Sequence, residues 1–261
     1  MAFPFDFGME LSTLAILALV AFTAGFIDAI AGGGGLLTIP ALLTAGLPPH
    51  LALGTNKLCA TFGSAMASYT FYRRKLFNPS QWRNALTATA MGALMGAILA
   101  HWLPSDWLNQ FLPVVVFACG LYLLFSKPPT APLTTDAAIA KGRQWPQGLT
   151  LGFYDGVVGP GTGAFWTVSS LLLYPLDLVR ASGVARSMNF ISNACALSIF
   201  IISGKVAWLL GISMGLALMA GAFLGARTAI KGGSKFIRPV FIMMVLALTA
   251  RLAWQHWFGQ A

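Results

Sequence analysis

Long apolar stretches recur along the whole chain and are separated by short polar segments. Each is close to the roughly 20 residues that a helix needs to cross about 30 Å of hydrocarbon. The stretches lack the strict alternation of apolar and polar positions that is typical of transmembrane barrel strands. The pattern therefore predicts an all-α membrane protein with about eight transmembrane helices, at residues 11–30, 58–74, 85–103, 107–126, 146–172, 187–204, 206–229 and 236–257.

The composition agrees with a membrane environment. Hydrophobic residues make up 57% of the 261 residues and charged residues only 9%, whereas soluble domains carry about 25% charged residues. The first apolar stretch follows the acidic flank "MAFPFDFGME", so we expect a retained helix and not a cleaved signal peptide. The net charge of +9 comes from cations scattered among the loops, which favours membrane topology over nucleic-acid binding as its cause.

Motifs of enzymes and metal sites are missing from the sequence. The chain has no P-loop, no HExxH and no GxSxG motif. Cys59, Cys119 and Cys195 fall inside predicted spans without metal-ligand spacing. We therefore expect no enzymatic activity, no cofactor and no bound metal.

The chain contains an internal repeat. "GFIDAIAGGGG", which starts at Gly25, matches "GFYDGVVGPGT", which starts at Gly152. In the same order, "ALGTNK" (52–57) matches "ASGVAR" (181–186), and "MGALMGA" (91–97) matches "MAGAFLGA" (219–226). Repeats of this kind indicate two similar halves, which we place at residues 8–126 and 146–258, joined by a Pro- and Thr-rich aqueous linker at 127–145.

The loop charges indicate that the two halves are inserted in opposite senses. In the first half the basic loop is the one after the second span (73–75), whereas in the second half it is a later loop (231–238). By the positive-inside tendency, this reversal predicts an inverted repeat with both termini outside. Four simple crossings in each half would contradict that orientation, so we expect a glycine-broken or re-entrant segment. Inverted repeats with broken helices near mid-membrane are a recurring plan of transporters.

Two glycine clusters are the first candidates for a binding site. They break a helix and free backbone N–H groups, which are tolerated at membrane depth only beside a cavity or other protein. A helix that resumes at "LLTIP" or "AFWTV" would point its positive end at that cavity and favour an anion. A purely structural break is the alternative. The candidate binding residues are Gly32, Gly33, Gly34, Gly35, Gly159, Gly161, Thr162 and Gly163. For Gly92, Gly96, Gly221 and Gly225 we instead expect helix packing.

Charged residues accompany both clusters. Asp28 and Asp155 each precede a cluster by four residues, and their carboxylates could carry a proton, pair with a cation or cap freed N–H groups. Lys57 and Arg186 occupy matched positions in the two halves, beside polar residues that include Asn56 and Asn189. We expect at least one of the two cations to face a substrate. Extension of both cations to lipid head groups is the alternative.

The segments "AGFIDAIAGGGGLLTIPALLTAGLPPHLALGTNKL" and "GFYDGVVGPGTGAFW…GVARSMNFISN" resemble the sulfite exporter TauE/SafE family, in its YfcA-like branch. The resemblance covers residues 12–257 and implies a multi-pass permease of the bacterial inner membrane for small sulfur-containing anions or organic acids. Pro160 and Thr162 depart from a plain glycine run, so the two clusters need not be equivalent.

Together these observations predict a secondary transporter of small anions, with its site between the two halves. The expected partners are a small anionic substrate and membrane lipid, with no role for nucleic acid. Proton coupling at the carboxylates stands beside capping as an open role. The alternative is a membrane scaffold or assembly factor that transports nothing.

Overall fold

The computed structural model describes residues 11–107 and 141–258, and within them the chain is helical without β-strands. All but the first residue of the predicted span at 107–126 and most of the predicted linker at 127–145 lie outside these residues. The helices are α1 (Leu11–Ala31), α2 (Gly35–Thr44), α3 (Pro49–Arg73), α4 (Arg83–Trp102), α6 (Lys141–Val157), α7 (Thr162–Leu173), α8 (Leu178–Ile202) and α9 (Trp208–Phe258).

Four of these segments are long and apolar enough to cross a membrane. They are Leu11–Ala31, Leu178–Ile202, Trp208–Gly233 and Pro79–Trp102, the last of which joins a short 3₁₀ helix (Pro79–Trp82) to α4. Large apolar side chains on them are exposed, for example Leu11, Trp102 and Ile202. An extensive exposed apolar surface on helices of this length is the surface expected to face lipid. The prediction of an all-helical membrane protein is therefore confirmed.

Two predicted boundaries were wrong, for one physical reason. The span predicted at 58–74 is α3, which begins at Pro49, and the span predicted at 187–204 is α8, which begins at Leu178. The missed turns are the first helical turns of α3 and α8, and they contain polar and charged residues that lower their hydropathy. Many of those residues are buried against other helices, so the missed turns need not be apolar to lie inside the protein.

The stretch predicted as one span at 146–172 is also not one helix. It divides into α6 and α7 around residues 158–161, and α1 and α2 are divided in the same way around residues 32–34. α2 has 10 residues and α7 has 12, so at 1.5 Å per residue each reaches about 15–18 Å, roughly half of a bilayer. The predicted glycine breaks, and the helices resuming after them, are confirmed.

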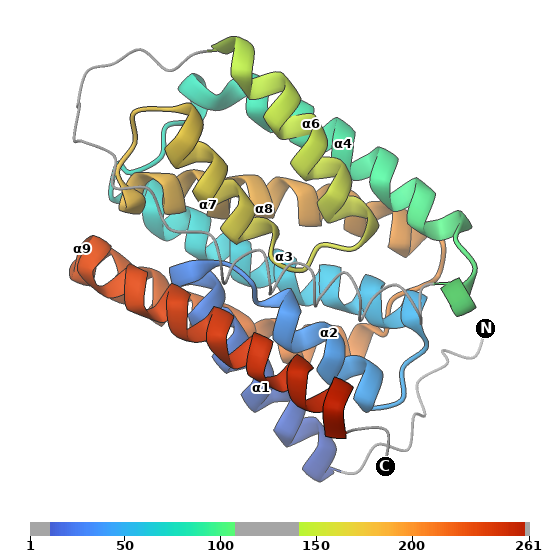
Figure 1. The fold of residues 1–261 in the computed structure, drawn as a ribbon. Coiled ribbons are helices and arrows are strands. Elements are labelled where there is room, and N and C mark those ends of the chain that lie inside the picture. Colours follow the sequence, from blue (N-terminus) through green and yellow to red (C-terminus); the bar gives the residue numbers. More distant parts are fainter. Residues whose placement is uncertain (1–10, 108–140, 259–261) are drawn as a thin grey trace.

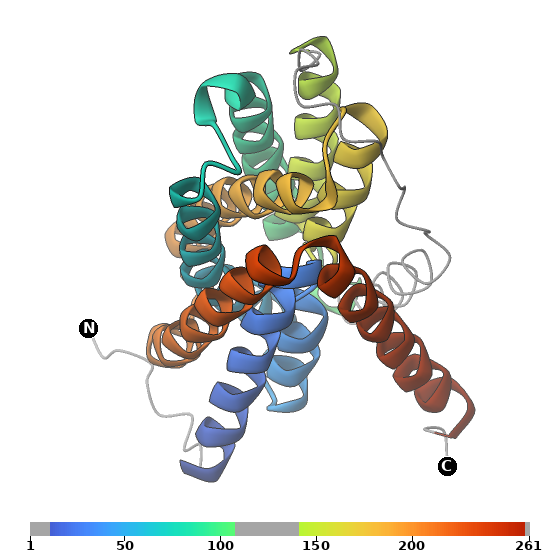
Figure 2. The ribbon, with the colours of Figure 1, turned by 90° about the vertical axis from the view of Figure 1, so that its left-hand side faces the viewer.

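The helices form two outer pairs around a central layer. α4 lies along α6 on one side and α1 lies along α9 on the other, while α3 and α8 pass between the pairs (Figure 1). The half-length helices α2 and α7 point into this central region. α9 itself turns sharply at Gly233, whose φ is 60°, and its two parts diverge (Figure 2).

Glycines allow both outer pairs to pack closely. A Cβ atom at Gly92 or Gly96 of α4 would collide with the backbone of α6, and one at Gly152 would collide with the backbone of α4. In the other pair, a Cβ atom at Gly221 or Gly225 of α9 would collide with the backbone of α1. The expected packing role of Gly92, Gly96, Gly221 and Gly225 follows from these contacts, because only small residues let helix backbones approach so closely.

We expect Gly96→Ala to lower the free energy of unfolding by about 1–3 kcal/mol, the usual cost of overpacking. The added methyl group would meet the Phe153 carbonyl oxygen and the Val157 nitrogen. Gly142→Ala is the matched control, because a Cβ atom there meets nothing within 4 Å. Thermal unfolding in detergent measures both variants, and an equal effect of the two would contradict the packing role.

Candidate functional site

Two breaks in the helices bring the glycine clusters into the interior. In the first break, Gly32 and Gly33 have φ values of 77° and 126°. In the second, Gly159 and Gly161 have φ values of 92° and 78°. Residues with a Cβ atom rarely adopt these backbone conformations with positive φ. Glycine is therefore required where the chain leaves one helix and enters the next.

The two breaks lie against each other. A Cβ atom at Gly32 would lie 2.5 Å from the carbonyl carbon of Gly163, and one at Gly35 would lie 3.6 Å from the Cα atom of Pro160. α2 and α7 therefore start at adjacent points, and the N-terminal ends of both helices meet at one place in the interior.

Asp28 caps the first break. Its Oδ1 atom accepts hydrogen bonds from the backbone N–H groups of Gly33 and Gly34, at 2.9 and 2.8 Å. Its Oδ2 atom lies 3.4 Å from a guanidinium nitrogen of Arg186. Among the three roles considered for this carboxylate, the geometry provides two at once, the cap and the counter-ion.

Asp155 has different partners, and it caps no backbone N–H group among the described residues. Its Oδ1 atom accepts a hydrogen bond from Lys57 Nζ at 2.9 Å and one from the Thr162 hydroxyl at 3.3 Å. Its Oδ2 atom accepts a hydrogen bond from Ser192. Asp155 is therefore a buried counter-ion, and the two carboxylates are not equivalent.

Each cation also contacts the carbonyl end of a broken helix. Lys57 donates to the carbonyl oxygen of Asp155, near the end of α6. Arg186 donates to the carbonyl oxygen of Asp28, near the end of α1, and to that of Gly163 at 3.1 Å. The C-terminal end of a helix carries partial negative charge, so a cation there stabilises it.

The ion pairs are reciprocal and deeply buried. The cation of each predicted half pairs with the carboxylate of the other half. The side chains of Lys57 and Arg186 are 1% and 0% exposed. Such burial contradicts the alternative that these cations extend to lipid head groups.

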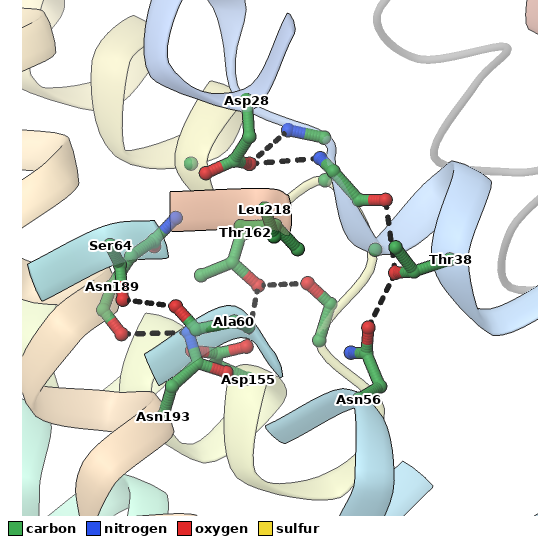
Figure 3. Close-up of a pocket in the computed structure, with 16 residues that line it drawn as sticks. Asp28, Thr38, Asn56, Ala60, Ser64, Asp155, Thr162, Asn189, Asn193 and Leu218 are labelled. Atoms are coloured by element: carbon green, nitrogen blue, oxygen red, sulfur yellow. Dashed lines mark hydrogen bonds between the residues drawn. The ribbon is translucent and has the colours of Figure 1, made fainter. Parts of the chain in front are cut away.

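Residues of both breaks line a small cavity (Figure 3). Its volume is about 30 Å³, room for one or two water molecules. Asn56 and Thr38 are joined by a hydrogen bond of 2.5 Å at one side. Asn189 and Asn193 approach from α8, and the Asn189 side-chain oxygen is buried with no hydrogen-bond partner within the described chain. The wall consists of Asp28, Gly33, Gly34, Gly35, Thr38, Asn56, Ala60, Ser64, Asp155, Gly159, Gly161, Thr162, Gly163, Asn189, Asn193 and Leu218.

Most residues singled out from the sequence line this cavity. The wall includes both carboxylates, both asparagines and all but one of the candidate glycines. Gly32, Lys57 and Arg186 are close by but are not part of the wall. Direct contact of either cation with a substrate therefore stays a prediction.

Three polar wall residues were not among the candidates, namely Thr38, Ser64 and Asn193. A helical spacing could have revealed two of them. Ser64 lies eight residues after Asn56, and Asn193 lies four residues after Asn189, so each shares a helix face with a candidate. Within the described ranges, no three His, Cys, Asp or Glu residues group together as metal ligands.

Comparison with known proteins gives a consistent result. The family described as sulfite exporter TauE/SafE matches residues 17–252. A probable membrane transporter protein, ORF9, of a Sinorhizobium species is 40% identical over 243 residues, which cover 92% of each chain. The probable membrane transporter protein YfcA of Escherichia coli K12 is 38% identical over 253 residues, 94% of each chain. One from Haemophilus influenzae is 39% identical over 258 residues, 97% of this chain and 99% of the relative. No solved structure matches the chain at a significant level.

Proposed function

The chain belongs to the sulfite exporter TauE/SafE family of bacterial multi-pass membrane transporters, and on this basis we propose that it is a secondary transporter of small anions. The proposed substrates are sulfite, sulfonates and related small organic acids. The matched relatives are named only as membrane transporters, and their names give no substrate. The proposed substrate class is therefore supported by the family description and by the chemistry of the cavity.

One observation carries the proposal. The N-terminal ends of α2 and α7 meet at a small polar cavity lined by both helix breaks. Helix N-termini offer free N–H groups and partial positive charge, which suit an anion. Discontinuous helices that aim their N-termini at an anionic group are a known design of secondary transporters.

The finer architecture belongs to the same proposal. We propose an inverted repeat in which each half makes an odd net number of membrane crossings, with the cavity near mid-membrane. The two halves exchange partner helices, and this exchange supports the proposal. α1 of the first half packs on α9 of the second half, and α6 of the second half packs on α4 of the first half. α3 and α8, one from each half, contact each other. The reciprocal ion pairs follow the same exchange. In such repeats, one half rocks against the other around a fixed central site.

Flux measurements in proteoliposomes test the function. Purified protein is assayed against a panel of sulfite, thiosulfate, sulfonates and small carboxylates, with empty liposomes as the control. Saturable movement of at least one of these anions is the expected result. Folded protein that moves none of them would favour a scaffold or assembly factor.

We further propose that Asp155 takes part in proton coupling. It lines the cavity, unlike its partner Lys57, and two hydroxyl groups as well as the ammonium group donate to it. An anion entering beside this carboxylate would be favoured by a proton that moves with it, because the proton removes one negative charge.

We expect Asp155→Asn to abolish the dependence of anion flux on a pH gradient. Asparagine keeps the size of the side chain and one acceptor oxygen, but it cannot release a proton. Flux driven by a pH gradient is compared with flux driven by the anion gradient alone, in the wild type and the variant. Unchanged pH dependence in a folded variant would exclude Asp155 as the proton carrier.

A further inference from the structure

The buried charges at the site cancel. Lys57, Asp155 and Arg186 are buried, and Asp28 is only partly exposed, so two cations stand beside two carboxylates. Apart from these four, no charged side chain of the described residues is buried. The formal charge of the site without substrate is therefore zero.

The cations and the carboxylates are arranged unequally around the cavity. Both carboxylates belong to the wall, whereas both cations lie behind it, against the carbonyl ends of α1 and α6. An anion in the cavity would therefore meet carboxylates directly, while the two cations, which are already paired, lie outside the wall. That arrangement opposes the entry of a highly charged ion.

The groups that can receive an anion are neutral donors. Asn189 is only 6% exposed, and its buried side-chain oxygen has no hydrogen-bond partner among the described residues. A flip of this amide exchanges the oxygen and the NH2 group, so Asn189 can present a donor to an anion. The backbone N–H groups of Gly35 and Gly163, which also line the cavity, have no acceptor in the described part of the chain. Each of the two helix N-termini adds about half of a positive charge. Together they match roughly one negative charge.

We infer that this cavity selects singly charged oxyanions, such as sulfonates, hydrogensulfite and monocarboxylates, over doubly charged ones, with Asn189 as a donor to the anionic group. The inference rests on the proposed transport function and narrows its substrate class. A second negative charge would lose its hydration without gaining a compensating cation, because both cations are already paired.

Matched pairs of ions test the selection by charge. Methanesulfonate and sulfate share a tetrahedral shape but carry one and two negative charges at neutral pH, and acetate and malonate form a second pair. Inhibition of anion flux in proteoliposomes gives the relative affinities. We expect the singly charged member of each pair to bind at least tenfold more tightly. Equal or tighter binding of the doubly charged member would overturn the inference. If no anion of the transport panel moves at all, the transport function itself fails.

A change of charge at the site should change this preference. Asp28→Asn keeps an acceptor for Gly33 and Gly34 but removes the counter-charge of Arg186, so the site gains one positive charge. We expect the preference for methanesulfonate over sulfate to fall at least tenfold. Asp177→Asn is the matched control, because that residue caps α8 through the Arg180 N–H group, outside the cavity wall.

The remaining outcomes are also decisive. An unchanged preference in a folded Asp28→Asn variant would overturn the inference. If that variant does not fold, Asn189→Ala provides a second measurement, because it removes a donor without changing any charge. We expect it to weaken methanesulfonate binding about tenfold, and unchanged binding would overturn the role of Asn189.

Discussion

Replacing Lys57 by alanine should lower the free energy of unfolding by about 3–5 kcal/mol, the usual cost of removing one partner of a buried ion pair. The ammonium group lies 2.9 Å from Asp155, and the two side chains are 1% and 3% exposed. Without Lys57, the Asp155 carboxylate would remain buried without a counter-charge, and one carbonyl group near the end of α6 would lose its donor. Chemical or thermal unfolding of the purified protein in detergent measures this loss.

Two further variants make the test specific. In Lys57→Met combined with Asp155→Asn, no charge is left unpaired, and we expect most of the lost stability to return. Arg180→Ala removes a surface ion pair with Asp177, whose side chains are 41% and 24% exposed. Such pairs contribute about 0–1 kcal/mol. A loss in Lys57→Ala no larger than in Arg180→Ala would contradict the importance of the buried pair.

Gly163→Ala should reduce anion flux about a hundredfold, a loss that can follow from displacing site groups by as little as 1 Å. The new Cβ atom would lie 2.7 Å from a guanidinium nitrogen of Arg186 and 2.7 Å from the amide nitrogen of Asn189. Both side chains would have to move away from the second break. Flux in proteoliposomes at equal amounts of inserted protein gives the effect.

Gly142→Ala is the control for this variant too, since its added methyl group meets no atom within 4 Å and it lies outside the cavity wall. We expect its flux to equal that of the wild type. Wild-type flux in Gly163→Ala would mean that the site tolerates a side chain at the second break. The proposed location of the substrate would then be wrong.

Much of the fold could be predicted from local features of the sequence. The glycine runs at 32–35 and 159–163 predict breaks because left-handed conformations and freed N–H groups follow directly from the residue types. Apolar runs such as 11–30 predict lipid-facing helices, because about 20 apolar residues in a helix are long enough to cross the hydrocarbon core. The boundary between 206–229 and 236–257 was anticipated, and the chain turns there at Gly233.

The unpredicted features depend on contacts between distant residues. The first turns of α3 and α8 are polar, and only their burial against other helices explains why they are helical inside the protein. The pairing of Lys57 with Asp155, and not with Asp28 of its own half, is a property of the assembled halves. The partner exchange also separates the roles of Asp28 and Asp155, although their sequence motifs are nearly the same.

The reciprocal ion pairs also constrain the biosynthesis of the protein. Asp155 follows Lys57 by 98 residues, and Arg186 follows Asp28 by 158 residues. At about 5–20 residues per second, the ribosome needs about 5–20 s after Lys57 to reach its partner. During that interval neither Lys57 nor Asp28 can form the ion pair that it has in the folded protein. A chain that stops before α6 therefore lacks the carboxylate with which Lys57 pairs in the folded protein.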